Sequence, residues 1–144
     1  MMALSPPHSY PLVITDGGRG QSEHHFNEKN DCVVRAFAIY LDWSYDRAHT
    51  YLMDWGRNNR RKTKQSVWIP CLIREYVRRW PNYMVGHRRT FKNLLRDEPR
   101  GSYIVEAQHH LVVVKEGVVY DNGFIMRPGA IVKSVWSRSH NFVQ

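Results

Sequence analysis

The chain has 144 residues, 42% hydrophobic and 24% charged, with a formal net charge of +8 and a pI near 9.8. This length suits one domain with a real core, and the composition excludes wholesale disorder. No apolar run approaches a membrane span and no basic-then-apolar leader opens the chain, so we expect a cytoplasmic protein without a membrane partner. The basic balance favours anionic partners, either nucleic acid or an acidic protein surface.

The first 29 residues contain three early prolines, a glycine-rich run at 17–20 and one short apolar patch at 12–14. Such a segment is typical of a flexible arm, or of an extended segment that lies on a domain. The sequence therefore predicts an N-terminal arm over residues 1–29 and a single domain over residues 30–144.

Two helices are predicted at the start of that domain. The first begins near Cys32, because Asn30 and Asp31 are good capping residues and the apolar residues that follow recur at helical spacing. The second covers residues 45–55 and is capped by Ser44.

A third helix is predicted over residues 70–80, because proline suits the first helical turn and Pro81 would end the helix. Cys71 lies in its apolar stripe and is interpreted as a packing residue. Residues 57–64 include no apolar residue and are interpreted as a solvated loop. Its cations could bind an anion or a partner, and they are Arg57, Arg60, Arg61, Lys62 and Lys64.

The second half of the chain changes to the period of strands. A short strand is predicted at 83–85 and a brief helix after Thr90. Valine-rich and isoleucine-rich runs then predict strands over 102–107, 110–115, 118–121 and 131–136, with a tight turn at residues 116–117. Helices followed by an antiparallel sheet indicate an α+β fold.

Three residues of these elements could form a catalytic site. Cys32 opens a helix, where the helix dipole stabilises a thiolate, although a free cysteine is commonly only a small buried apolar residue. A two-residue turn would put His110 and Asp121 on one face of the hairpin, where the acid could orient the imidazole. A three-residue turn would put Asn122 there instead.

The order of these pieces carries a family resemblance. Asn30-Asp31-Cys32 before an apolar helix, the run Gly-Ser-Tyr-Ile-Val at 101–105, His110, and the run Gly-Val-Val-Tyr-Asp at 117–121 together resemble the papain-like cysteine peptidase superfamily. More narrowly, they resemble small bacteriophage and bacterial proteins of that fold.

The resemblance implies a papain-like fold in which N-terminal helices pack on a small antiparallel sheet. It also implies a thiol hydrolase that cleaves a peptide, isopeptide or related amide bond, acts on a polypeptide substrate or host protein, and works in the host cytoplasm if a phage encodes it. Members of that superfamily usually have a polar side chain shortly before the cysteine, which donates a hydrogen bond to the oxyanion. The resemblance makes Asn30 the candidate for this role. No cofactor is expected.

One alternative accompanies this hypothesis, and a further kind of site is excluded. A basic binding or effector protein could use the same fold without catalysis and contact a host protein or, less readily, nucleic acid. Histidines are numerous, but the chain lacks the tightly spaced ligand pairs of a structural zinc site, so no metal site is predicted.

Overall fold

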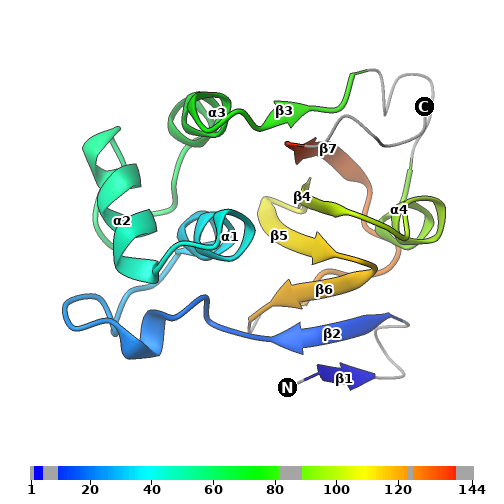
Figure 1. Ribbon diagram of the computed structural model, residues 1–144, viewed down its shortest axis with the longest axis horizontal. Helices are drawn as coiled ribbons and strands as arrows, with labels where there is room; N and C mark the ends of the chain where they lie inside the picture. The colour runs from blue at the N-terminus through cyan, green and yellow to red at the C-terminus, as the bar shows by residue number, and fades with distance from the viewer. Residues whose placement is uncertain (1, 5–9, 82–88, 123–124, 139–144) are drawn as a thin grey trace. The chain divides into compact units, whose positions relative to one another are not determined.

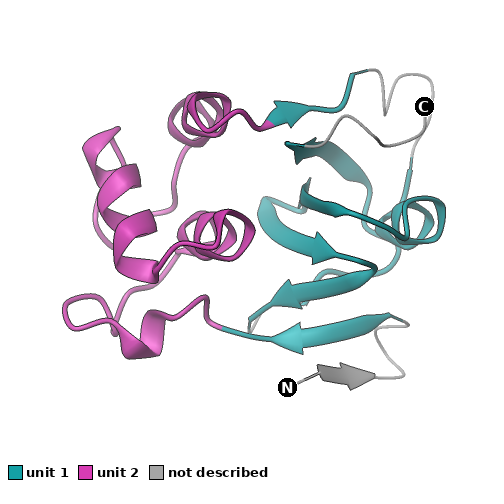
Figure 2. Cartoon of the chain, viewed as in Figure 1, with its two compact units in different colours: residues 1–15, 78–144 teal, residues 16–77 magenta. Residues whose placement is uncertain are grey.

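A computed structural model describes residues 2–4, 10–81, 89–122 and 125–138. The chain forms two compact units (Figure 2). Unit 1 comprises residues 1–15 and 78–144, and unit 2 comprises residues 16–77. Unit 2 carries three of the helices, and unit 1 carries the strands and a further helix, so the predicted α+β class is confirmed (Figure 1). None of the helices in the described ranges is long and apolar enough to cross a membrane.

Unit 2 is helical apart from its long first segment. Its elements are a short 3-10 helix η1 (Arg19–Gln21) and the helices α1 (Cys32–Leu41), α2 (Tyr45–Asp54) and α3 (Gln65–Arg74). The first two helices match the prediction, and the Ser44 hydroxyl caps α2 by accepting a hydrogen bond from the Arg47 amide. Their apolar stripes are buried, and α1 packs on α2 while α2 packs on α3.

The predicted position of the third helix is wrong. It begins five residues earlier than expected and ends at Arg74, with Pro70 inside it. Trp68, Cys71 and Leu72 supply its buried face. The helical spacing of apolar residues therefore begins before Pro70. Beyond the helix the chain turns at Tyr76, whose φ is 61°.

The sheet of unit 1 is mixed, which corrects the expectation of an antiparallel one. Its strands are β1 (Met2–Leu4), β2 (Pro11–Ile14), β3 (Arg78–Arg79), β4 (Ser102–Ala107), β5 (His110–Lys115), β6 (Val118–Asp121) and β7 (Val132–Ser137). Among the described residues they are ordered β1-β2-β6-β5-β4-β7-β3. The strand β2 pairs with β6 in parallel, and the other neighbours pair antiparallel.

Two segments therefore differ from their predicted roles. The apolar patch of the expected N-terminal arm is β2, a strand inside the sheet with Leu12 fully buried. Arg78 and Arg79, expected in the third helix, form an edge strand beside β7. The short strand predicted at 83–85 lies outside the described residues.

The strands β4, β5 and β6 have the predicted bounds, and the hairpin between the last two has the predicted two-residue turn. Lys115 pairs with Val118 across it. Glu116 and Gly117 have φ values of 49° and 78°, which is the pattern of a type I′ turn whose twist matches that of the strands. This turn sets the register of the hairpin.

The core of unit 1 lies between one face of the sheet and the helix α4 (Phe91–Asp97). Thr90 caps α4 as predicted, with its hydroxyl accepting from the Asn93 amide. Phe91 and Leu94 pack against alternate residues of the central strands. Successive side chains of a strand point to opposite faces, so these valines and aromatic residues share one face of the sheet.

Candidate functional site

Cys32 is the first residue of α1 and belongs to unit 2. Its thiol is not in a disulfide, and the residue is 9% exposed. At this position the backbone N–H groups of the first turn and the helix dipole favour a negative charge on sulfur. The start of the helix therefore favours the thiolate, whereas burial of the side chain opposes it.

Asp31 precedes the cysteine but does not cap the helix with its side chain. Instead, its buried carboxylate accepts hydrogen bonds from Arg35 at 2.7 Å, from Arg19 at 3.3 Å and from the Tyr45 hydroxyl at 2.7 Å. Burial and this carboxylate raise the pKa of Tyr45, so its hydroxyl remains a donor. Two guanidinium groups offset the negative charge of Asp31, which would otherwise oppose a thiolate beside it.

His110 and Asp121 meet within unit 1. The histidine opens β5 and the aspartate ends β6, so the hairpin brings both to the same end of the sheet. His110 Nε2 lies 2.9 Å from one carboxylate oxygen of Asp121 and 3.1 Å from the other. Both side chains are buried, at 8% and 3% exposed.

This contact selects the tautomer of the imidazole. A carboxylate can only accept, so Nε2 of His110 carries the proton and Nδ1 is left as the basic nitrogen. The charge on Asp121 also acts on its surroundings. Burial and, to a lesser extent, this charge raise the pKa of Tyr10 to about 12.

The comparisons with known proteins give no further guide. No protein-family model, curated protein or solved structure matches the chain. The geometry of the side chains therefore carries the functional argument.

The structure brings together two of the three predicted catalytic residues. His110 and Asp121 are paired in unit 1, whereas Cys32 belongs to unit 2. The meeting of the thiol with the imidazole stays a prediction. Asn122, the alternative third member, has its backbone N–H on Asp121 Oδ1 at 2.8 Å, so it holds the carboxylate rather than replacing it.

Asn30, the oxyanion candidate, has a different visible role. It is exposed, has a φ of 53°, and its side-chain amide donates to the backbone carbonyl of Arg60 at 3.2 Å. A left-handed conformation at this position turns the chain into α1. Asn30 thus links the start of α1 by a hydrogen bond to the basic segment at residues 57–64.

The prediction that Arg57 is a solvated cation is wrong. Its side chain has no exposed area, and Nη1 donates to Glu28 Oε2 at 3.1 Å. His49, on α2, places its Nε2 at 2.6 Å from the same oxygen. A lone acid cannot be buried cheaply, so the guanidinium and the imidazole accompany the carboxylate of Glu28.

Glu28 has a lowered pKa. Burial acts to raise it, but hydrogen bonds from His49, from the Lys29 amide and from Arg57 outweigh burial. The carboxylate is therefore ionised at neutral pH. The other predicted cations of the loop, Arg60, Arg61, Lys62 and Lys64, are exposed, as a partner-binding surface requires.

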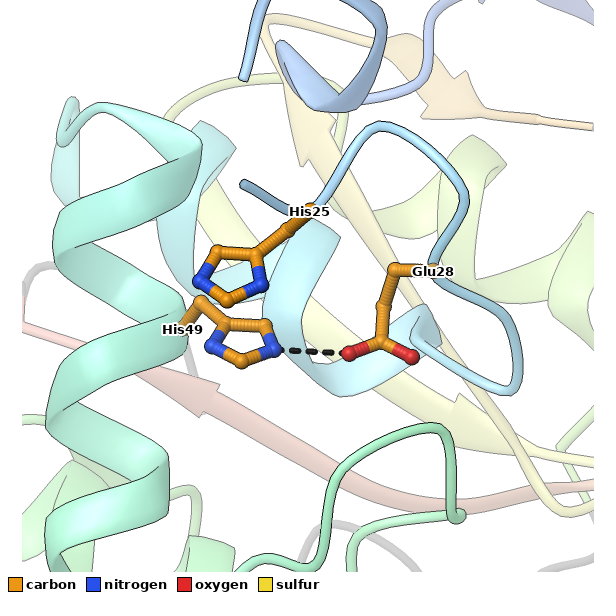
Figure 3. Close-up of side chains that lie close together, drawn as sticks. All are labelled: His25, Glu28 and His49. Carbon is orange, nitrogen blue, oxygen red and sulfur yellow. Dashed lines mark hydrogen bonds and ion pairs between the residues drawn. The ribbon is translucent and has the colours of Figure 1, made fainter. Parts of the chain in front are cut away.

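Sequence reasoning missed His25, a fourth member of this group beside Glu28, His49 and Arg57. The ring of His25 stacks on that of His49, with centroids 3.5 Å apart and planes inclined by 15° (Figure 3). Burial and the neighbouring His49 lower the pKa of His25, which keeps it neutral at pH 7. His25 and Glu28 lie three residues apart without a regular period, and His49 follows 21 residues after Glu28, so local spacing gave no signal.

Proposed function

We propose that the protein is a thiol hydrolase of the papain-like type that cleaves a peptide, isopeptide or related amide bond. The observation that carries the proposal is the buried His110–Asp121 pair, in which Nε2–H points at the carboxylate and Nδ1 is the ring nitrogen left for a reaction partner. A general base that takes a proton from a thiol needs its ring held in one tautomer and orientation, and this pair supplies both. The start of α1 supplies the second element, because Cys32 occupies the position where a thiolate is stabilised.

In the proposed mechanism, His110 takes the thiol proton and Cys32 Sγ attacks the carbonyl carbon of the substrate. The C=O π pair moves to oxygen, where the Cys32 backbone N–H and further donors hold the oxyanion. The C–N bond then breaks, and His110 protonates the leaving amine. Water, deprotonated by His110, attacks the thioester and releases the acid. Deamidases and transglutaminases share the acyl-enzyme step and belong to the same proposal.

The direct test is the alkylation rate of Cys32 with iodoacetamide as a function of pH, read by mass spectrometry. We expect Cys32 to react well below the ordinary thiol pKa. Cys71 is an internal control, because burial raises its pKa to about 11. His110→Ala should slow the alkylation of Cys32, and His109→Ala, at the exposed neighbouring position, should not.

Two outcomes would end the catalytic proposal. One is equal alkylation rates for Cys32 and Cys71 in the folded protein. The other is an alkylation profile of Cys32 that His110→Ala leaves unchanged. Asp121→Ala adds a graded test, since it removes only the orienting carboxylate and should have a smaller effect than His110→Ala.

The exposed cations between α2 and α3 favour a second candidate, a basic protein that binds a host protein or nucleic acid without catalysis. Arg60, Arg61 and Lys62 are consecutive and exposed. Heparin or DNA retention should fall when all three are neutralised to glutamine, with a matching loss of salt dependence. Retention that is unchanged in this triple variant would exclude the loop as the binding surface.

A further inference from the structure

The side chains of His25, Glu28 and His49 converge inside unit 2 (Figure 3). Their candidate ligand atoms all lie within 4.8 Å of one another. His25 and Glu28 come from the irregular segment that leads to α1, and His49 comes from α2. Glu28 and His49 are buried, while His25 is half-buried at the edge of the group.

We propose that His25, Glu28 and His49 bind a divalent transition-metal ion, for which Zn²⁺ is the best match. Two imidazole nitrogens and one carboxylate oxygen are a donor set that zinc accepts readily, with a fourth position left for water. Hard cations such as Mg²⁺ and Ca²⁺ prefer oxygen ligands and fit this set poorly. The proposal is independent of the thiol chemistry proposed above.

The present spacing needs only a small change to reach coordination. Zinc bonds of about 2.0–2.2 Å put tetrahedral ligands about 3.3 Å apart. His49 Nε2 and Glu28 Oε2 already lie 2.6 Å apart, joined by a proton. The ion would replace that proton, and His25 would turn its ring inward. His25 lies outside the regular helices and strands and is only half-buried, so this rotation need not disturb a regular element.

The surroundings of Glu28 hold the carboxylate in place before an ion arrives. Arg57 donates to Oε2 at 3.1 Å and the Lys29 amide donates to Oε1 at 3.0 Å. Carboxylate ligands of metals are commonly oriented by such hydrogen bonds. The positive charge of Arg57 opposes the ion and weakens binding, so moderate rather than tight affinity is expected.

Hydrogen bonds account for the positions of the Glu28 and His49 side chains. The position of the His25 ring is set by stacking instead. Its backbone N–H donates to the Ser22 hydroxyl, which fixes the chain, whereas its ring lies face to face with that of His49. A neutral imidazole stacked there brings a third ligand to one point. Neutral imidazole is also the form that binds metals, and the lowered pKa of His25 is consistent with it.

Bound metal would join the segment before α1 to α2. It would therefore stabilise unit 2 without taking part in any reaction. The experiment that tests the site accordingly measures metal binding rather than activity. The full-length protein is stripped with EDTA, exchanged into chelator-free buffer and titrated with Zn²⁺ by calorimetry. Co²⁺ serves as a second probe, because its visible absorption reports coordination geometry. Cys32→Ser is the background, so that its thiol cannot supply the site.

We expect one ion per chain, a rise in Tm on adding Zn²⁺, and an affinity at least about tenfold lower in His25→Ala. The matched control is His24→Ala, because His24 is adjacent and its side chain is 77% exposed. It should bind as the background does. His25→Ala removes a half-exposed ring, so circular dichroism should show that it folds.

Either of two results would overturn the metal site. One is the absence of saturable Zn²⁺ binding by the folded protein. The other is equal affinity in His25→Ala and His24→Ala, which would put any bound ion on other residues. His49→Gln is a further variant, and retention of the Co²⁺ spectrum in that variant would contradict the proposal in the same way.

Discussion

Removal of the Arg57 guanidinium should destabilise the protein strongly, although Arg57 lies in a segment with the composition of a surface loop. In Arg57→Met the carboxylate of Glu28, 1% exposed, loses the cation 3.1 Å away. His49 and the Lys29 amide remain as its partners. Breaking a buried ion pair costs about 3–5 kcal/mol, and the remaining hydrogen bonds favour the lower end. About 3 kcal/mol is a large part of a typical stability.

The assay is urea unfolding followed by circular dichroism, with EDTA present so that no metal contributes. With a slope of about 2 kcal/mol per molar urea, the midpoint should fall by about 1.5 M. Arg60→Met is the matched control. It removes an exposed cation from the same segment, and surface changes of this kind stay within about 0.5 kcal/mol.

Equal midpoints for Arg57→Met and Arg60→Met would refute the reasoning. A second variant separates the loss of charge pairing from the loss of packing. Glu28→Gln combined with Arg57→Met removes both charges, so it should be more stable than the sum of the two single changes predicts. Strict additivity would mean that the two side chains do not interact in solution.

The remaining predictions need one variant or one pH series each. Tyr45→Phe deletes the phenol that donates to buried Asp31 at 2.7 Å, so urea unfolding should show a loss of about 1–2 kcal/mol. Tyr76→Phe, at a residue 75% exposed, should show none. Burial raises the pKa of Cys71 from 9.0 to about 11. Because the folded pKa is the higher one, this contribution to stability is complete below pH 9 and lost as the pH rises through 11. It amounts to roughly 3 kcal/mol, and Cys71→Ala should show a smaller alkaline decline. Gly117 has a φ of 78° in the hairpin turn, so Gly117→Ala should cost about 1 kcal/mol, and an unchanged Tm would contradict a left-handed turn.

The central strands were predictable because their signals are local. In β4 and β5 most residues are apolar and many of these are β-branched. The Glu116–Gly117 pair between β5 and β6 adopts the positive φ values of a tight turn. Once the turn length is known, the register follows, and with it the pairing of His110 with Asp121. The histidine and its acid were therefore within reach of sequence reasoning.

The third helix shows how one strong local rule can mislead. Proline favours the first turn of a helix, yet Pro70 lies within α3. Its missing N–H removes one hydrogen bond, while the burial of Trp68 and Leu72 on the same face offsets the loss. Tertiary packing decided the start of this helix, and a single-residue rule cannot contain that information.

Pairings between distant segments were also beyond the sequence. The strand β2 is four residues long and pairs in parallel with β6, more than a hundred residues later. A strand this short has no period that distinguishes it from a loop, and only its partner makes it regular. The same holds for Arg57, whose carboxylate partner is 29 residues earlier in the chain.

These distant ionic pairings also bear on the start of α1. Two buried carboxylates, Glu28 and Asp31, are held by cations from separate parts of unit 2, and Cys32 follows directly. The first turn of the helix is thus fixed by buried ion pairs rather than by a capping side chain. Loosening either carboxylate should disturb the backbone N–H groups on which a Cys32 thiolate would depend. Tyr45→Phe tests this at a distance from the thiol, because a change in the alkylation profile of Cys32 would link the ion pairs of unit 2 to the proposed chemistry.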